Sequence, residues 1–158
     1  MSEWQRFAEL LGAESGALGD LGTAALELTD ALVVNDAAGI EAAERRVAGR
    51  VVLHASAYQQ RVGMQKRGFG TLTLPQVCAY APPALRRALH GYAHEIGVRT
   101  IALTITASNN KALILAGMDR LARSVAVIQH AGTEHPGTYK RRGTVPPPTG
   151  SVIVSRRA

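Results

Sequence analysis

The apolar residues of this chain recur at the three- and four-residue spacing of amphipathic helices. In the first segment this stripe consists of Trp4, Phe7, Leu11, Leu18, Leu21, Ala25, Leu28 and Leu32. Glu14 is its single polar interruption. Side chains at this spacing lie along one face of a helix, so the pattern predicts a helix from about Ser2 to Val34. Four glycines lie within it, Gly12, Gly16, Gly19 and Gly22. Each costs about 1 kcal/mol relative to alanine, and we interpret them as marking a soft helix rather than a close backbone approach.

A second helix is predicted after the break at Asn35-Asp36. Asp36 is a candidate N-cap for a helix from about Ala37 to Gln65. Its apolar stripe consists of Ile40, Val47, Val51, Ala55, Tyr58 and Val62. Two helices joined by so short a turn form an antiparallel hairpin. Residues 66–73 are then expected to form a loop, and residues 75–80 a short helical turn that Pro82 and Pro83 end.

The longest predicted helix runs from Pro83 to about Ala131, and this stretch contains no further proline. Its continuous face consists of Leu85, Leu89, Tyr92, Ile96, Leu103, Asn110, Leu113, Ile114, Gly117, Met118, Leu121, Val125 and Ile128. Residues 98–106, VRTIALTIT, are dense in β-branched side chains, which favour strands, but the chain offers no second strand to pair with them. Gly132 and Pro136 provide a stop signal.

These elements predict an all-α fold: an elongated antiparallel helical hairpin plus one long C-terminal helix, in a three-helix, coiled-coil-like bundle. We assign residues 1–133 to this helical domain. Residues 134–158, with the prolines at 146–148, are expected to form an extended or flexible tail. A hydrophobic share of 46% with only 4% aromatic residues fits one domain whose core is built from aliphatic side chains.

The formal net charge of +6 raises the question of an anionic partner such as nucleic acid. Much of that charge lies in the last twenty residues, as Lys140, Arg141, Arg142, Arg156 and Arg157. The helical body is therefore close to neutral, and nucleic-acid binding is not favoured.

No coherent catalytic or metal site emerges from the sequence. His90 and His94 are spaced i to i+4 and Glu95 follows them, but this order differs from the metalloprotease HExxH and has no third ligand. Cys78, the only cysteine, excludes an intrachain disulfide and is typical of a small core residue. We expect no enzyme activity, no metal and no cofactor. The N-terminus lacks the pattern of a signal peptide, which predicts a cytoplasmic location.

Helix length points to a binding function. At 1.5 Å per residue the first helix spans about 50 Å and the last about 70 Å, which leaves about 20 Å of the last helix unaccompanied. If the first and last helices run parallel, this part carries Met118, Leu121, Val125 and Ile128. Each such side chain contributes roughly 1.5 to 3 kcal/mol when it leaves water. A partner helix, a second copy, the tail or the chain's own short helix could cover them.

Two short motifs resemble those of FlgN-type flagellar export chaperones. Asn110-Lys111-Ala112-Leu113-Ile114 is similar to the family's asparagine followed by paired apolar residues, and Thr138-Tyr139-Lys140-Arg141-Arg142-Gly143 is similar to its tyrosine-to-glycine tail element. The early leucine stripe, the hairpin, the mid-chain LTLPQV and the long last helix also follow the family's order. The resemblance covers nearly the whole chain.

The resemblance implies a chaperone for the hook-filament junction proteins. It would bind their C-terminal helical segments, prevent premature assembly and deliver them to the cytoplasmic domain of the flagellar export gate. We expect client binding by Leu113, Ile114, Met118, Leu121, Val125 and Ile128, which we call the client stripe.

By the same resemblance, Asn110 is the family-motif residue, and Tyr139 and Gly143 match the gate-docking element. Membrane association would occur only through the gate. The alternatives are a helical adaptor or oligomerisation module without an export role, and a nucleic-acid-binding protein that uses the basic tail. Whether the chain forms a homodimer stays open.

Overall fold

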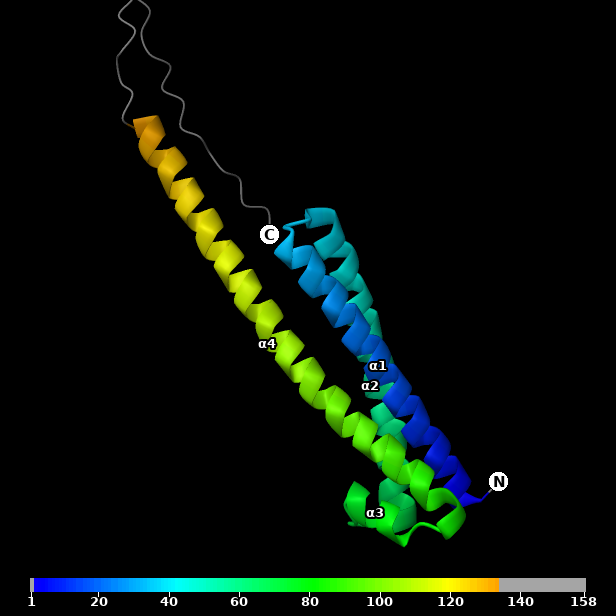
Figure 1. Ribbon diagram of the computed structural model, residues 1–158. Coiled ribbons are helices and arrows are strands. Elements are labelled where there is room, and N and C mark those ends of the chain that lie inside the picture. Colours follow the sequence, from blue (N-terminus) through cyan, green and yellow to red (C-terminus); the bar gives the residue numbers. More distant parts are fainter. Residues whose placement is uncertain (1, 134–158) are drawn as a thin grey trace, which may run out of the picture. The chain divides into compact units, whose positions relative to one another are not determined.

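The computed structural model describes residues 2–133, which form four helices and no strand (Figure 1). The helices are α1 (Glu3–Val33), α2 (Ala37–Phe69), α3 (Leu74–Tyr80) and α4 (Pro83–Thr133). The predicted all-α fold class is therefore confirmed. Residues Met1–Asp119 form one compact unit, and α4 continues from it into a second unit that begins at Arg120. The predicted tail, with Tyr139 and Gly143, lies outside the described residues.

The ends of α1 follow from local hydrogen bonding. Ser2 is the N-cap and forms a reciprocal capping box with Gln5, in which each side chain binds the other residue's backbone N–H at 3.2 and 2.8 Å. At the far end, Asn35 adopts a left-handed φ of 55° and turns the chain into α2. Asp36 occupies the predicted N-cap position, but its side chain makes no capping hydrogen bond.

The core of the compact unit lies at the end where all four helices meet. Its buried residues are Phe7, Leu11, Met64, Val77, Cys78, Ala81 and Leu89. Phe69 packs against this cluster, with its ring centroid 4.6 Å from that of Trp4 and 5.1 Å from that of Phe7. These aromatic contacts stabilise the last turn of α2, which ends at Phe69 rather than at the predicted Gln65. Gly70, at a φ of 65°, then ends the helix.

The predicted stripe of α1 is confirmed, whereas that of α2 is wrong at several positions. Phe7, Leu11, Leu18, Leu21, Ala25 and Leu28 are all buried. In α2, however, Val51 and Tyr58 are 47% and 42% exposed. The buried positions of α2 are instead Ala43, Arg61 and Met64, with His54 and Ala57 half-buried between them. The α2 seam therefore contains polar side chains, which a search for apolar residues passes over.

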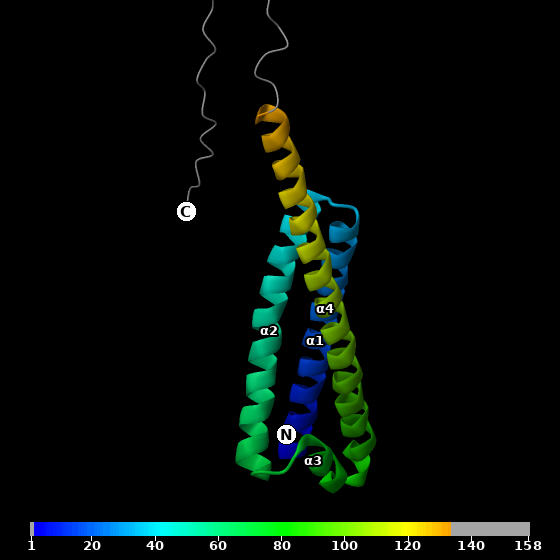
Figure 2. The same ribbon diagram turned by 90° about the vertical axis from the view of Figure 1, so that its left-hand side faces the viewer.

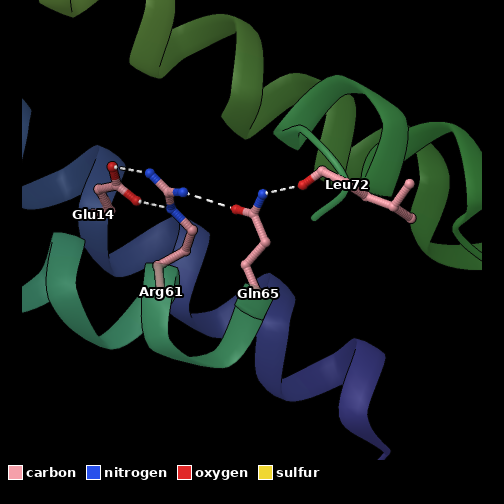
Figure 3. A network of polar contacts seen from close by, with 4 residues as sticks. All are labelled: Glu14, Arg61, Gln65 and Leu72. Atoms are coloured by element: carbon pink, nitrogen blue, oxygen red, sulfur yellow. Dashed lines mark hydrogen bonds and ion pairs between the residues drawn. The ribbon is translucent and has the colours of Figure 1, made fainter. Parts of the chain in front are cut away.

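A buried ion pair explains why an arginine lies in that seam (Figure 3). Arg61 donates two hydrogen bonds to the Glu14 carboxylate, at 2.6 and 3.0 Å, and a third to Gln65 at 2.8 Å. Gln65 in turn donates to the Leu72 carbonyl at 2.7 Å. The Glu14 side chain is only 2% exposed. The network thus joins α1, α2 and the loop before α3, and both charges are compensated by bidentate pairing.

The neighbouring residue, Ser15, joins α1 to α4. Its hydroxyl donates to Glu95 at 2.9 Å and accepts a hydrogen bond from Arg99 at 2.9 Å, and Arg99 also donates to the Ser15 carbonyl. Further along, Asn110 of α4 contacts Ala25 and Thr29 of α1. The contacting residues are offset by 80 to 85 positions throughout, so this part of α4 runs parallel to α1 (Figure 2).

Two of the α1 glycines make room for side chains of α4. A Cβ on Gly12 would lie 3.3 Å from the Tyr92 ring, and one on Gly19 would lie 3.1 Å from the Arg99 guanidinium. Gly16 and Gly22 have no heavy atom within 4 Å of that position. At Gly12 and Gly19 the atoms that approach closely belong to side chains and not to another backbone. Our interpretation that the glycines soften the helix stays a prediction.

The β-branched segment 98–106 is helical, as predicted. The hydroxyls of Thr100, Thr104 and Thr106 each donate to the backbone carbonyl four residues earlier, at 2.7, 2.8 and 3.0 Å. These bonds satisfy the hydroxyls on an exposed helix without a cross-strand partner. Local bonding therefore accommodates a sequence whose propensity favours strands.

Removing one partner of the buried ion pair is expected to destabilise the fold strongly. Arg61→Met leaves the Glu14 carboxylate buried and unpaired, which should lower the free energy of unfolding by about 3 to 5 kcal/mol. Glu14→Leu combined with Arg61→Met should recover most of that loss, because no uncompensated charge remains. Urea denaturation of the two variants measures both effects.

Arg50→Met is the matched control, since it breaks the exposed Arg50–Asp20 pair of 3.0 Å and should cost less than about 1 kcal/mol. A double variant no more stable than Arg61→Met alone would contradict the assigned role of the pair.

Candidate functional site

An open apolar groove of about 450 Å³ runs between α1, α2 and α4 in the compact unit. Its lining residues are Leu21, Ala25 and Leu28 from α1, Val47 and Val51 from α2, and Leu103, Ala107, Asn110, Lys111, Ile114 and Leu115 from α4. Nearly all are aliphatic. The volume lies in the range of binding pockets, and the open side admits an extended or helical guest rather than enclosing a small molecule.

The groove exists because α4 is joined to the hairpin by side chains rather than by close backbone packing. The backbones of α1 and α2 pack closely along the hairpin. Between Leu103 and Ile114, by contrast, α4 presents the small Ala107 toward the groove, and α1 presents Ala25. Small side chains on facing helices leave unfilled volume unless the backbones approach, and here Asn110 bridges α4 to the Ala25 carbonyl through its side chain.

Asn110 is the polar anchor of this region. It is 6% exposed, donates through Nδ2 to the Ala25 carbonyl at 2.9 Å, and accepts through Oδ1 from the Thr29 hydroxyl at 2.7 Å. Both polar ends of its side chain are therefore satisfied within the protein. Asn110 fixes where α4 crosses α1, immediately beside the groove.

The one charged residue of the groove lining is Lys111. It is exposed and forms no ion pair within residues 2–133. The arginines of the neighbouring α2 are paired instead, Arg46 with Glu27 at 2.6 Å and Arg50 with Asp20 at 3.0 Å. An apolar guest with a carboxylate near Lys111 would therefore complement the groove in both shape and charge.

The residues of the predicted client stripe fall into three environments. Ile114 lines the groove, and Leu113 beside it is half-buried. Met118, still in the compact unit, is 63% exposed and is not part of the lining. Leu121, Val125 and Ile128 belong to the second unit and are exposed, Leu121 to 66% and Ile128 to 70%. Of the predicted client stripe, only Ile114 therefore lines the groove.

The residues considered as metal ligands or as a nucleophile lie outside the groove lining. His90 and His94 are exposed, and Glu95 is engaged by Ser15 and Arg99. No group of three or more His, Cys, Asp or Glu side chains in residues 2–133 could hold a metal ion. Cys78 is buried, and its thiol donates to the Leu89 carbonyl at 3.6 Å. Burial raises the pKa of the Cys78 thiol, which disfavours the reactive thiolate.

Comparisons with protein-family models, with curated proteins and with solved structures give no match. None of the helices in the described part of the chain is both long and apolar enough to cross a membrane.

Sequence reasoning identified Asn110 and Ile114 but missed the half of the groove that the hairpin supplies. Leu21, Ala25 and Leu28 read as ordinary core residues of the first stripe, and they are buried. These three residues also border the groove, because α1 and α4 are far enough apart to leave it open. The available signal was weak: a polar Asn110 on an apolar face, with the small Ala107 one turn earlier.

Asn110→Ala is expected to lower the free energy of unfolding by about 1 to 3 kcal/mol, because it removes the hydrogen bonds of a buried side chain to Ala25 and Thr29 of α1. Asn109→Ala is the matched control. Asn109 is exposed on the same turn, and its replacement should change stability by no more than about 0.7 kcal/mol, the difference in helix propensity. Thermal and urea denaturation measure both variants. Equal effects would show that the Asn110 hydrogen bonds contribute nothing to the fold.

Proposed function

We propose that this protein is a helix-binding chaperone of the FlgN type, which holds the C-terminal helical segments of hook-filament junction proteins before their export. Two observations carry the proposal: the compact unit has an open apolar groove that Ile114 lines, and the second unit exposes the apolar residues Leu121, Val125 and Ile128. The resemblance in sequence gives the identity of the clients.

The exposed stripe supports binding of a helix rather than of a small molecule. Exposed apolar side chains that recur along one helix face favour a partner with a matching apolar face, as in helix-in-groove recognition. Monomeric proteins rarely leave such contiguous apolar surface uncovered. Met118 adds adaptability, since an unbranched thioether side chain can fit related clients of unequal shape.

The groove supports an amphipathic guest. The groove lining from α1, α2 and α4 is apolar apart from Asn110 and Lys111, and Asn110 is already engaged with α1. Lys111 is therefore the cation that a client carboxylate would meet. A helix whose apolar face carries an acidic residue at its border would satisfy this arrangement.

The delivery step rests on the sequence resemblance alone. Tyr139 and Gly143 match the family's gate-docking element, and they lie outside the described residues. A docking element separate from the client stripe would let one chain hold its client and engage the gate at the same time, which raises the effective concentration of client at the gate.

Client binding is expected to depend on the stripe. The full-length chain should bind a C-terminal peptide of a hook-filament junction protein in isothermal titration calorimetry. Leu121→Glu combined with Val125→Glu should weaken this binding at least about tenfold, because each buried aliphatic side chain contributes more than the 1.4 kcal/mol that a factor of ten requires. Circular dichroism should show unchanged helicity, since both side chains are exposed.

Val127→Glu is the matched control. Val127 is also exposed in the same part of α4 but lies on the opposite side of the helix, so its replacement should leave peptide affinity unchanged. No binding by the unaltered chain at peptide concentrations of tens of micromolar, or equal losses in control and stripe variants, would contradict the proposed client site.

Gate docking is expected to depend on Tyr139. Tyr139→Ala should leave the calorimetric affinity for the client peptide unchanged, because the residue is not part of the stripe. In cells that depend on this chaperone, the same variant should reduce secretion of the junction proteins. Secretion at the unaltered level would refute the docking role without affecting the client site.

A further inference from the structure

A second apolar face of α4 lies away from the hairpin except at Leu115, which also borders the groove. We define this outer face by residues three or four apart, namely His94, Val98, Ile101, Ile105, Ser108, Ala112, Leu115 and Asp119. The core-facing residues Leu89, Ile96 and Leu103 lie on the other side of the same turns. Ile101 and Ile105 are 65% and 57% exposed, and Val98 and Leu115 are similarly exposed.

A helix that is apolar on two opposite faces is expected to be covered on both. The hairpin contacts the inner face, through residues such as Leu89, Tyr92 and Asn110, and of the outer-face residues only Leu115 borders the groove. Exposed β-branched residues also lower helix propensity, so neither solubility nor helix formation explains Val98, Ile101 and Ile105 at these positions. The outer face lies wholly within the compact unit Met1–Asp119.

We propose that the outer face of α4 binds the same face of a second copy of this chain, as an antiparallel two-stranded coiled coil. The sequence of the face is complementary to its own reverse. With Ile105 opposite Ser108 of the other copy, Ile101 lies opposite Ala112 and Val98 opposite Leu115. His94 then lies opposite Asp119 at both ends of the contact.

This register satisfies both packing and charge. Isoleucines meet serine and alanine, so large side chains fill the space that small ones leave. The end layers place an imidazole N–H near a carboxylate, an arrangement that favours one orientation. Each contact occurs twice because of the two-fold symmetry, as closed homodimers require.

The parallel alternative lacks these features. It would place Ser108 against Ser108 and Ala112 against Ala112, which leaves unfilled volume, and Asp119 against Asp119, which repel. An unrelated partner helix would not need the large residues Ile101 and Ile105 to be matched by small residues at the mirrored positions Ala112 and Ser108 of this same face. The self-complementarity therefore favours a second copy as the occupant.

Sedimentation equilibrium of the full-length chain, over concentrations up to about 200 µM, tests the association. The chain should be dimeric at the upper end, and Ile101→Glu combined with Ile105→Glu should weaken dimerisation at least about tenfold, because each dimer would bury four added carboxylates. Val52→Glu, at an exposed valine of α2, is the matched control and should leave the dimer intact. A monomer at all concentrations, or a dimer unaffected by the Ile101 and Ile105 replacements, would overturn the proposal.

Cysteine cross-linking tests the orientation. Ile101→Cys and Ala112→Cys, prepared as separate single variants and mixed, should form a disulfide-linked dimer under mild oxidation, because the two positions lie opposite each other. Neither variant should cross-link alone, since an antiparallel pair separates the two copies of either position by about 16 Å along the axis. Cys78 is buried and does not compete. Cross-linking within the unmixed samples, or its absence in the mixture, would overturn the antiparallel register.

These tests are independent of the proposed chaperone function. Ile101 and Ile105 are part of neither the client stripe nor the groove lining, so their replacement should leave client-peptide affinity unchanged. Conversely, the Leu121 and Val125 replacements should leave dimerisation unchanged. Each proposal can fail while the other stands.

Discussion

The buried carboxylate of Glu14 is the constraint around which the compact unit is organised. A charge with 2% exposure must be compensated within the protein, and this forces Arg61 into the α2 seam and aligns Gln65 with the Leu72 carbonyl. The next residue, Ser15, points toward Glu95 and Arg99 of α4. Two consecutive residues of α1 thereby set its register against both other long helices. The apolar contacts among the buried core residues, where all four helices meet, add stability but specify the register of the helices less strictly.

The groove follows from the way these polar contacts are distributed. They hold α4 at Ser15 and again at Asn110, and between those anchors the groove lining includes the small Ala107 beside Leu21 and Leu103. Tight packing there would require α4 to approach α1 more closely, which the Arg99 guanidinium over Gly19 and the Asn110 side chain oppose. The same polar groups that specify the arrangement of the helices therefore also leave apolar volume unfilled, and Ile114 lines this volume.

The sequence predicted the fold well where apolar periodicity governs the structure. The α1 stripe, the turn at Asn35 and the long α4 agree with the structure because burial of aliphatic residues determines them. The prediction from apolar periodicity failed in α2, where Arg61 is buried between the helices and Val51 stays exposed. The reason is that the burial of Arg61 depends on its ion-pair partner Glu14, which lies forty-seven residues away in the sequence. The exposed part of the client stripe was predictable from helix length. The hairpin's half of the groove was not, since it depends on interhelical distance rather than on the pattern within one helix.

The threonine-rich turn of α4 has a consequence for the unfolded chain. In the helix, the hydroxyls of Thr100, Thr104 and Thr106 bind carbonyls one turn earlier, which offsets part of the conformational cost of β-branched residues. Once the helix melts, those bonds vanish and residues 98–106 become a proline-free window of high strand propensity with a single charge at Arg99. Such windows nucleate cross-β aggregation. The helical state of α4 thus also protects the chain from self-templated misfolding, and partial unfolding of this one helix would carry a disproportionate risk.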